Sequence, residues 1–211
     1  EILRNHSRRT DVIGGSLLSA QNLFPKKEKR LELRMRHQRL PSTEASSHPQ
    51  ITLAKDKKVP PTMFPESLIH DCHEIVNEGV EQLKMPVGIV SHIYNDVYQI
   101  VTINSEMGVL INGAVFSLND TYCRDVYRSD ALLAITEIDG QPGMVRHPLY
   151  VSLPVEAYIS APIHHAGEVW GTINFTSTKL RKPFSKAQQK LVKGYADKIS
   201  QLLAAIDATA A

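Results

Sequence analysis

Cysteine is scarce in this sequence, with only Cys72 and Cys123 among 211 residues, and no Cys/His spacing typical of a zinc site is present. Two cysteines cannot form the disulfide framework of a small secreted domain, and their scarcity is typical of a reducing, cytoplasmic compartment. No uninterrupted apolar run approaches the ~18 residues that a membrane-spanning helix needs. A start methionine and a leader are missing at Glu1, so we expect a piece of a longer protein.

The motifs of common enzyme classes are missing as well. The sequence contains no Gly-x-Ser-x-Gly elbow, no phosphate-binding Gly-x-x-x-x-Gly-Lys and no His-Glu-x-x-His. No nucleophile and base stand at a spacing that indicates catalysis. We therefore assign no catalytic residue and no metal site, and the sequence leaves any cofactor unknown.

Charge is distributed unevenly along the chain, although the net charge is only +2. Residues 1–61 carry 13 Lys and Arg against 6 Asp and Glu, whereas residues 62–211 carry 11 against 16. Residues 41–61 are also rich in Pro, Ser and Lys, and such a segment buries too little apolar surface to offset the entropy of ordering it. We therefore predict a basic, partly disordered arm and linker over 1–61 and a folded domain over 62–211.

Apolar periodicity predicts a helix near each end of the folded domain. Steps of three and four residues predict a helix over 65–84 and place Cys72 on its apolar stripe as a buried packing thiol. A last helix begins at Ser185, where Gln188 completes a capping box. Five of its residues have heptad spacing, which predicts a dimer interface that we call the heptad seam: Val192, Tyr195, Ile199, Leu202 and Ile206. The neighbouring Leu191 and Leu203 are expected to cover the sheet instead.

Short apolar or alternating runs between the two helices predict strands. The strands are expected over 87–93, 97–103, 114–118, 132–138, 156–163 and 168–176. Asn95-Asp96 and Ala166-Gly167 close two hairpins. A polar stretch over 119–154 is long enough to indicate a functional loop. This order predicts an α+β fold, with an antiparallel sheet that carries helices on one face and the long loop on the other.

Several stretches, in the right order, resemble the GAF domain family, in particular the bacterial and archaeal signalling members attached to histidine kinases and diguanylate cyclases. They are Phe116-Ser-Leu-Asn-Asp-Thr-Tyr-Cys123, His147-Pro-Leu-Tyr150, Val155-Glu-Ala-Tyr-Ile-Ser-Ala-Pro162, Gly167-Glu-Val-Trp-Gly-Thr-Ile-Asn-Phe175 and Pro183-Phe184-Ser185. The resemblance covers about residues 64–207. It implies a six-stranded antiparallel sheet flanked by N- and C-terminal helices, a ligand cavity between the sheet and the long loop, and dimerisation through the terminal helices.

The long loop carries the best candidates for contact with a ligand, because aromatic rings and guanidinium groups suit a planar or anionic molecule. The candidates are Tyr122, Cys123, Arg124, Tyr127 and Arg128 on the loop, and Tyr150, Tyr158 and Asn174 on the sheet side. In the alternative interpretation the tyrosines pack the loop onto the sheet and the arginines face water.

Two chemical activities found among members of the GAF domain family, which this sequence resembles, require cysteine. Its bilin-binding members attach the chromophore through a Cys that is followed by His, whereas Arg124 follows Cys123 here, so we expect no covalent chromophore. Sulfoxide reduction needs an attacking thiolate and a nearby resolving thiol. Cys72 is predicted on a helix and Cys123 on a loop, and the sequence gives no sign that they pair.

The favoured hypothesis is a non-catalytic regulatory module of a cytosolic signalling protein, which binds a small molecule, forms a homodimer, or does both. Its output domain would lie outside this chain. One alternative is an enzyme resembling free methionine-(R)-sulfoxide reductases. Another is a nucleic-acid-binding regulator that uses the basic arm, for which steep salt dependence would be the signature. A module that has lost its ligand and serves only in dimerisation is a further alternative.

Overall fold

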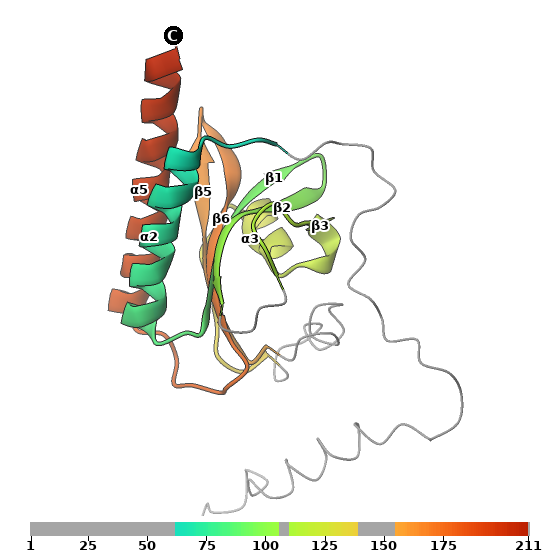
Figure 1. The fold of residues 1–211 in the computed structure, drawn as a ribbon. Coiled ribbons are helices and arrows are strands. Elements are labelled where there is room, and N and C mark those ends of the chain that lie inside the picture. Colours follow the sequence, from blue (N-terminus) through green and yellow to red (C-terminus); the bar gives the residue numbers. More distant parts are fainter. Residues whose placement is uncertain (1–61, 106–109, 139–154, 211) are drawn as a thin grey trace, which may run out of the picture. The chain divides into compact units, whose positions relative to one another are not determined.

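The computed structural model describes residues 62–105, 110–138 and 155–210, which form a six-stranded antiparallel sheet with helices on both faces (Figure 1). The predicted α+β fold class is confirmed. The arm and linker over 1–61 and the candidate Tyr150 lie outside the described residues. In chain order the elements are α2 (Glu66–Leu83), β1 (Val87–Tyr94), β2 (Val97–Ser105), β3 (Val115–Ser117), the short helix η1 (Leu118–Asp120), α3 (Cys123–Ser129), β4 (Leu133–Ile135), β5 (Ala157–His165), β6 (Glu168–Ser177) and α5 (Lys186–Ala210).

The sheet has the strand order β3-β2-β1-β6-β5-β4, and each neighbouring pair is antiparallel. Two hairpins, β1–β2 and β5–β6, therefore meet where β1 pairs with β6. In the first turn Asn95 and Asp96 have φ of 49° and 59°, the left-handed backbone that favours Asn and Asp in tight hairpins. In the second turn Ala166 and Gly167 have φ of 51° and 84°. Both predicted hairpins are thus confirmed.

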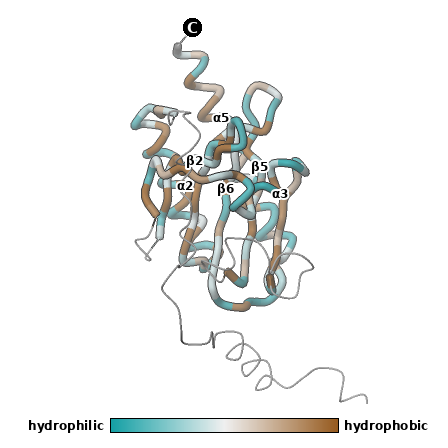
Figure 2. The backbone as a smooth tube through the Cα atoms, turned by 90° about the vertical axis from the view of Figure 1, so that its right-hand side faces the viewer, coloured by the Kyte–Doolittle hydropathy of each residue, from teal (hydrophilic) through white to brown (hydrophobic). Residues whose placement is uncertain are grey.

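Helices α2 and α5 cover one face of the sheet, and α3 lies on the other (Figure 1). Gly79 lets α2 approach the sheet closely, since a Cβ built there would lie 2.1 Å from Cζ of Phe175. Cys72 is fully buried in the same core, which confirms the predicted packing thiol. Figure 2 shows hydrophobic and hydrophilic stretches alternating along α5, as expected for a helix with one face on a sheet. No helix in the described part of the chain combines the length and hydropathy needed to cross a membrane.

The start of α5 and the end of α2 are both capped by hydrogen bonds. The amide of Gln188 donates to Oγ of Ser185 at 3.2 Å, and the amide of Ser185 donates to Oε1 of Gln188 at 3.0 Å. This reciprocal pair is the predicted capping box. Helix α2 is capped by Lys84, which has a left-handed backbone (φ 53°). The amide of Lys84 donates to the carbonyl of Glu81 at 3.3 Å, and the amide of Met85 donates to the carbonyl of Val80 at 3.2 Å.

The heptad seam is wrong for three of its five members. Val192, Tyr195 and Ile199 are at most 1% exposed and pack in the core between α5 and the sheet. Heptad spacing marks one face of a helix without saying what covers it, and here that face lies on the sheet. Only Leu202 and Ile206 stay half-buried at its edge. Of the two residues predicted to cover the sheet, Leu203 is buried and Leu191 is half-buried.

The stretch after β3 is more ordered than a long loop. It contains α3, which the sequence did not predict, and the fourth strand spans only Leu133–Ile135 rather than 132–138. Helix α3 has seven residues and buries only Cys123 and Val126, so its apolar pattern is too short to reveal a period. Residues 139–154 of this stretch lie outside the described residues.

Candidate functional site

A group of polar side chains is buried on the face of the sheet that α3 covers. We call it the polar cluster, and each member is at most 4% exposed: Ser91, Tyr98, Cys123, Tyr158, Thr172 and Asn174. Strands β1, β2, β5 and β6 and helix α3 all contribute to it. Alternate residues of a strand point to the same face, so Thr172 and Asn174 of β6 lie there together, whereas the intervening Ile173 faces α2 and α5.

The hydrogen bonds of the polar cluster converge on the sulfur of Cys123. The hydroxyl of Tyr158 donates to Sγ at 3.2 Å, and Nδ2 of Asn174 approaches it at 3.5 Å. The same Nδ2 lies 3.3 Å from the hydroxyl of Tyr98. Next to them Oγ of Ser91 lies 2.9 Å from Oγ1 of Thr172. Groups from distant parts of the sequence therefore share one continuous hydrogen-bonded patch.

Burial keeps the polar cluster uncharged. Desolvation raises the pKa of the Cys123 thiol, and hydrogen bonds from Thr172, Tyr158 and Tyr98 oppose this rise without cancelling it. Desolvation also raises the pKa of Tyr98 and of Tyr158 well above the usual range. The cluster thus offers neutral donors and acceptors, which suit an uncharged polar group better than an ion.

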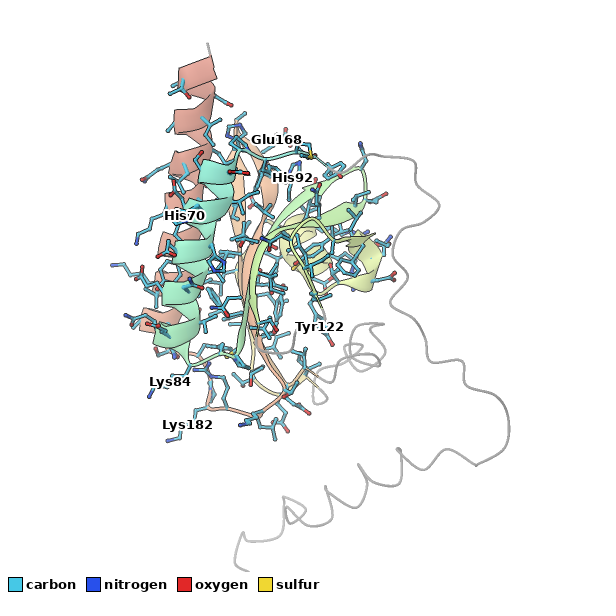
Figure 3. The ribbon with its side chains drawn as sticks, viewed as in Figure 1. His70, Lys84, His92, Tyr122, Glu168 and Lys182 are labelled. Carbon is cyan, nitrogen blue, oxygen red and sulfur yellow. The ribbon has the colours of Figure 1, made fainter. Side chains whose placement is uncertain are left out.

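Tyr122 packs α3 onto the sheet, as the alternative interpretation holds. Its side chain is fully buried, and its ring centroid lies 5.5 Å from that of Tyr158 in a tilted arrangement. Figure 3 places Tyr122 on the side of the sheet away from α2 and α5. It therefore forms an aromatic wall beside the polar cluster.

The structure does not bring the other loop candidates into the polar cluster. Nε of Arg124 pairs with Oδ1 of Asp125 at 3.0 Å, and Nη2 of Arg128 donates to Oδ1 of Asn119 at 2.8 Å. Both arginines are thus bound to groups of their own segment, Arg128 in an exposed position. Tyr127 is half-buried against the apolar residues around the cluster. Of the eight predicted residues, the cluster unites Cys123, Tyr158 and Asn174.

Sequence reasoning missed Ser91, Tyr98 and Thr172 as site residues. Alternating polar residues in a strand normally indicate a face in water. The signal that could have found them is that both faces of this sheet were predicted to be covered. The polar residues at alternate positions of β6, such as Thr172 and Asn174, must then be buried, and so must Ser91, which pairs with Thr172.

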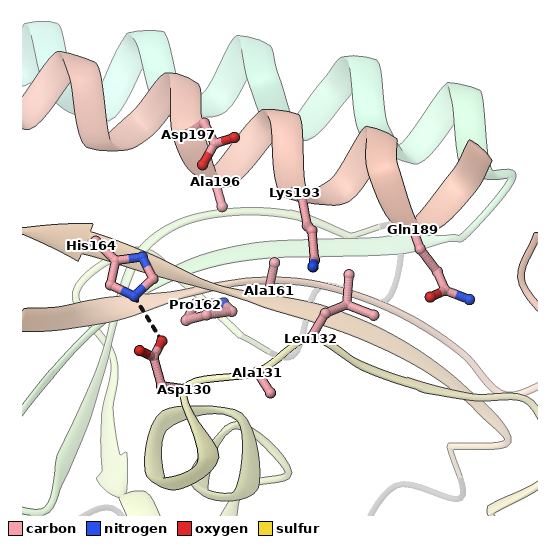
Figure 4. A pocket seen from close by; sticks show the side chains of 10 residues that line it. All are labelled: Asp130, Ala131, Leu132, Ala161, Pro162, His164, Gln189, Lys193, Ala196 and Asp197. Carbon is pink, nitrogen blue, oxygen red and sulfur yellow. Dashed lines mark hydrogen bonds and ion pairs between the residues drawn. The ribbon is translucent and has the colours of Figure 1, made fainter. Parts of the chain in front are cut away.

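A second group of charged residues lines a pocket of about 440 Å³ between α5 and β5 (Figure 4). Nε2 of His164 lies 2.7 Å from Oδ1 of Asp130, while Lys193 and Asp197 project from α5. The side chains of His164 and Asp130 are 48% and 57% exposed, and such a pair contributes little in water. Among the described residues, no three His, Cys, Asp or Glu side chains group as a metal site requires.

Comparison with known families decides what this architecture is. The model of the GAF domain matches residues 67–203, which include the sheet, the polar cluster and most of α2 and α5. The chain belongs to the GAF domain family. None of the curated proteins matches it in sequence.

Solved structures with the same fold come from several kinds of protein. The GAF domain of Thermosynechococcus elongatus PixJ, in its blue-light absorbing form, is 17% identical with a TM-score of 0.52, over 70% of this chain and 96% of that one. A type II free methionine-R-sulfoxide reductase from Thermoplasma acidophilum is 16% identical with a TM-score of 0.55, over 65% of this chain and 93% of that one. Residues 122 to 287 of a methyl-accepting chemotaxis protein are 14% identical with a TM-score of 0.58, over 67% of this chain and 92% of that one. At these identities the likeness concerns the GAF fold alone.

Proposed function

We propose that this GAF domain is a non-catalytic regulatory module that binds a small, uncharged polar molecule against the polar cluster. The observation that supports it is that neutral hydrogen-bonding groups gather on the α3 side of the sheet, whereas β5 and β6 present mainly apolar residues such as Ile159, Ile173 and Phe175 to the face under α2 and α5. A ligand there would exchange hydrogen bonds with Asn174, Tyr158 or Tyr98. Burial would make each well-placed bond more selective than it is in water.

The two cysteines support a binding role over sulfoxide reduction. Cys72 belongs to the core under α2 and α5, whereas Cys123 belongs to the core under α3, so the sheet separates the two thiols. Desolvation, with a smaller contribution from Asp71, raises the pKa of Cys72 to about 12, and burial also raises the pKa of Cys123. The thiolate is the attacking species in such chemistry, and at neutral pH both sulfurs are held as thiols.

Native mass spectrometry of the purified protein tests this proposal. We expect a retained small molecule in the parent protein, and its loss in Asn174→Leu, which removes the amide while keeping similar volume. The matched control is Asn104→Leu, because Asn104 hydrogen-bonds Asn77 at 2.7 Å outside the cluster. Equal retention in the parent and both variants would refute the assignment of the site. Consumption of free methionine sulfoxide that depends on Cys123 would favour the reductase alternative instead.

We also propose that the domain forms homodimers through the C-terminal part of α5, around Leu202 and Ile206. Figure 1 shows the C-terminal end of α5 running past the beginning of α2. Both side chains are half-buried at the edge of the core, so a partner helix would remove further apolar surface from water. If two α5 helices pack together, a small movement of the sheet on ligand binding would change the angle at which they cross. Such a change could pass a signal to a neighbouring domain.

A further inference from the structure

A second pocket, of about 520 Å³, lies where α2 ends and where the segment after β6 leads into α5. Its volume falls within the range of small-molecule sites. Its basic residues are Lys84, from the end of α2, and Lys179, Arg181 and Lys182, from the segment between β6 and α5. Figure 3 shows Lys84 and Lys182 at the same end of the domain, Lys84 just past α2 and Lys182 before α5. We call this site the basic pocket.

The charged side chains among the described lining of the basic pocket are all positive. Among the described residues that line the basic pocket there is no Asp or Glu. Lys84, Lys179 and Lys182 have no ion-pair or hydrogen-bond partner for their ammonium groups within the described part of the chain. The first turn of α5 carries no acidic residue either. Like charges so close repel one another, and a bound anion is the simplest way to offset that repulsion.

Arg181 is held in place at the wall of the basic pocket. Its Nη1 donates to the carbonyl oxygen of Leu83 at 3.1 Å and lies 2.8 Å from the sulfur of Met85. Its guanidinium carbon sits 4.2 Å from the centre of the Phe184 ring. Burial lowers the pKa of Arg181, as expected for a partly desolvated cation. Within the described part of the chain these hydrogen bonds use only Nη1, which leaves Nε and Nη2 as a fork for a second group.

We propose that the basic pocket binds a small phosphate-bearing anion with at least two negative charges. A pre-oriented guanidinium with free donors recognises phosphate through paired hydrogen bonds, and the lysines add point charges around it. Soluble diphosphates and lipid headgroups share this chemistry. The basic pocket shares no residue with the polar cluster and does not depend on the ligand proposed there.

Isothermal titration with inorganic diphosphate at low salt tests the proposal. We expect saturable binding with a Kd of about 1 mM or tighter. Lys84→Gln and Lys182→Gln should each raise the Kd at least about fivefold, since each removes one charge from the site. The matched control, Lys190→Gln, removes an exposed lysine of α5 that does not line the pocket, and should change the Kd less than about twofold. Circular dichroism checks that all three variants fold.

Vesicles of phosphatidylcholine, with and without phosphatidylinositol phosphate, separate the two sources of the anion. Binding of diphosphate without vesicle binding supports a soluble ligand, and binding of both supports a headgroup that reaches the same pocket. Absence of saturable diphosphate binding overturns the proposal, including the case in which only vesicles bind. An equal loss of affinity in Lys190→Gln also overturns it, because the effect would then reflect overall charge.

Discussion

The two faces of the sheet are both buried, yet they carry different kinds of residue. Along β6 the side chains of Ile173 and Phe175 enter an apolar core, while those of Thr172 and Asn174 enter the polar cluster. Apolar packing accepts many partners of about the right size. A buried hydrogen-bonding group is selective, because a partner that leaves it unpaired loses free energy. The comparison indicates that the face under α2 and α5 provides stability and the face under α3 provides selectivity.

Neighbouring substitutions on β6 provide the strongest test of this difference. Phe175→Ala should destabilise the domain by about 3–5 kcal/mol, because it leaves a cavity in the packed core. Asn174→Ala should cost about 1–3 kcal/mol, because it leaves the buried Tyr98 hydroxyl with fewer partners. Urea denaturation of the two variants measures both values. If Asn174→Ala costs as much as Phe175→Ala, the division between the two faces is wrong.

Glycines on the two long helices provide a second test of tight packing under α2. Gly79→Ala should destabilise the domain by about 1–3 kcal/mol, because the new methyl group collides with the Phe175 ring. Gly194 on α5 is the matched control, since a Cβ there meets nothing within 4 Å. Gly194→Ala should stabilise the domain by about 0.5–1 kcal/mol through helix propensity. A thermal melt that moves in the same direction for both variants would contradict the packing described for Gly79.

Local signals in the sequence were enough to predict most of the framework. The turn residues Asn95 and Asp96 and the capping box of Ser185 and Gln188 act over a few residues, so the chain itself reveals them. The same holds for the amphipathic stripe of α2, with Cys72 inside it. Such elements need no knowledge of what packs against them.

The errors arose where the identity of the covering surface matters. Val192, Tyr195 and Ile199 have the spacing of a coiled-coil seam, but a sheet covers that face instead of a second helix. The sequence also does not show that Arg124 pairs with Asp125 and that Arg128 donates to Asn119 of η1, outside the polar cluster. Tyr98 joins the polar cluster only through strand pairing with distant residues. These features depend on tertiary contacts, which periodicity and composition do not report.

The pH dependence of stability should reveal the thiol on the apolar face. The pKa of Cys72 rises from 9.0 to about 12 on folding, so the folded state holds the proton more tightly. Stability from this group is complete below pH 9 and is lost as pH rises toward 12, with a limiting slope of about 1.4 kcal/mol per pH unit. Urea denaturation across this range should show the decline, and Cys72→Ala should reduce its steepness. An unchanged slope in Cys72→Ala would place the titration elsewhere.

The outer edge of the face under α2 and α5 should carry the dimer contact. Leu202→Glu with Ile206→Glu is expected to convert a dimer to a monomer while the fold is kept, because both side chains are only half-buried. Each should weaken association by on the order of 1 kcal/mol or more. Light scattering measures the mass, and Lys190→Glu on the same helix is the control for added negative charge. A parent protein that is already monomeric at tens of micromolar would remove the basis of this proposal.

The smallest effect concerns Lys84, which lines the basic pocket and has a strained backbone. Its left-handed backbone, with φ of 53°, is one that glycine adopts without steric cost. Lys84→Gly should therefore stabilise the domain by about 0.5 kcal/mol, after allowing for the lost attraction between a cation and the helix C-terminus. Lys84→Gln removes the same charge without relieving the strain, so it should destabilise slightly. Both variants should bind diphosphate more weakly if the basic pocket is an anion site. Urea denaturation measures the stability of the two variants, titration measures their diphosphate affinity, and together they separate backbone strain from charge. A Lys84→Gly variant that gains stability and keeps full diphosphate affinity would show that Lys84 does not contact the anion.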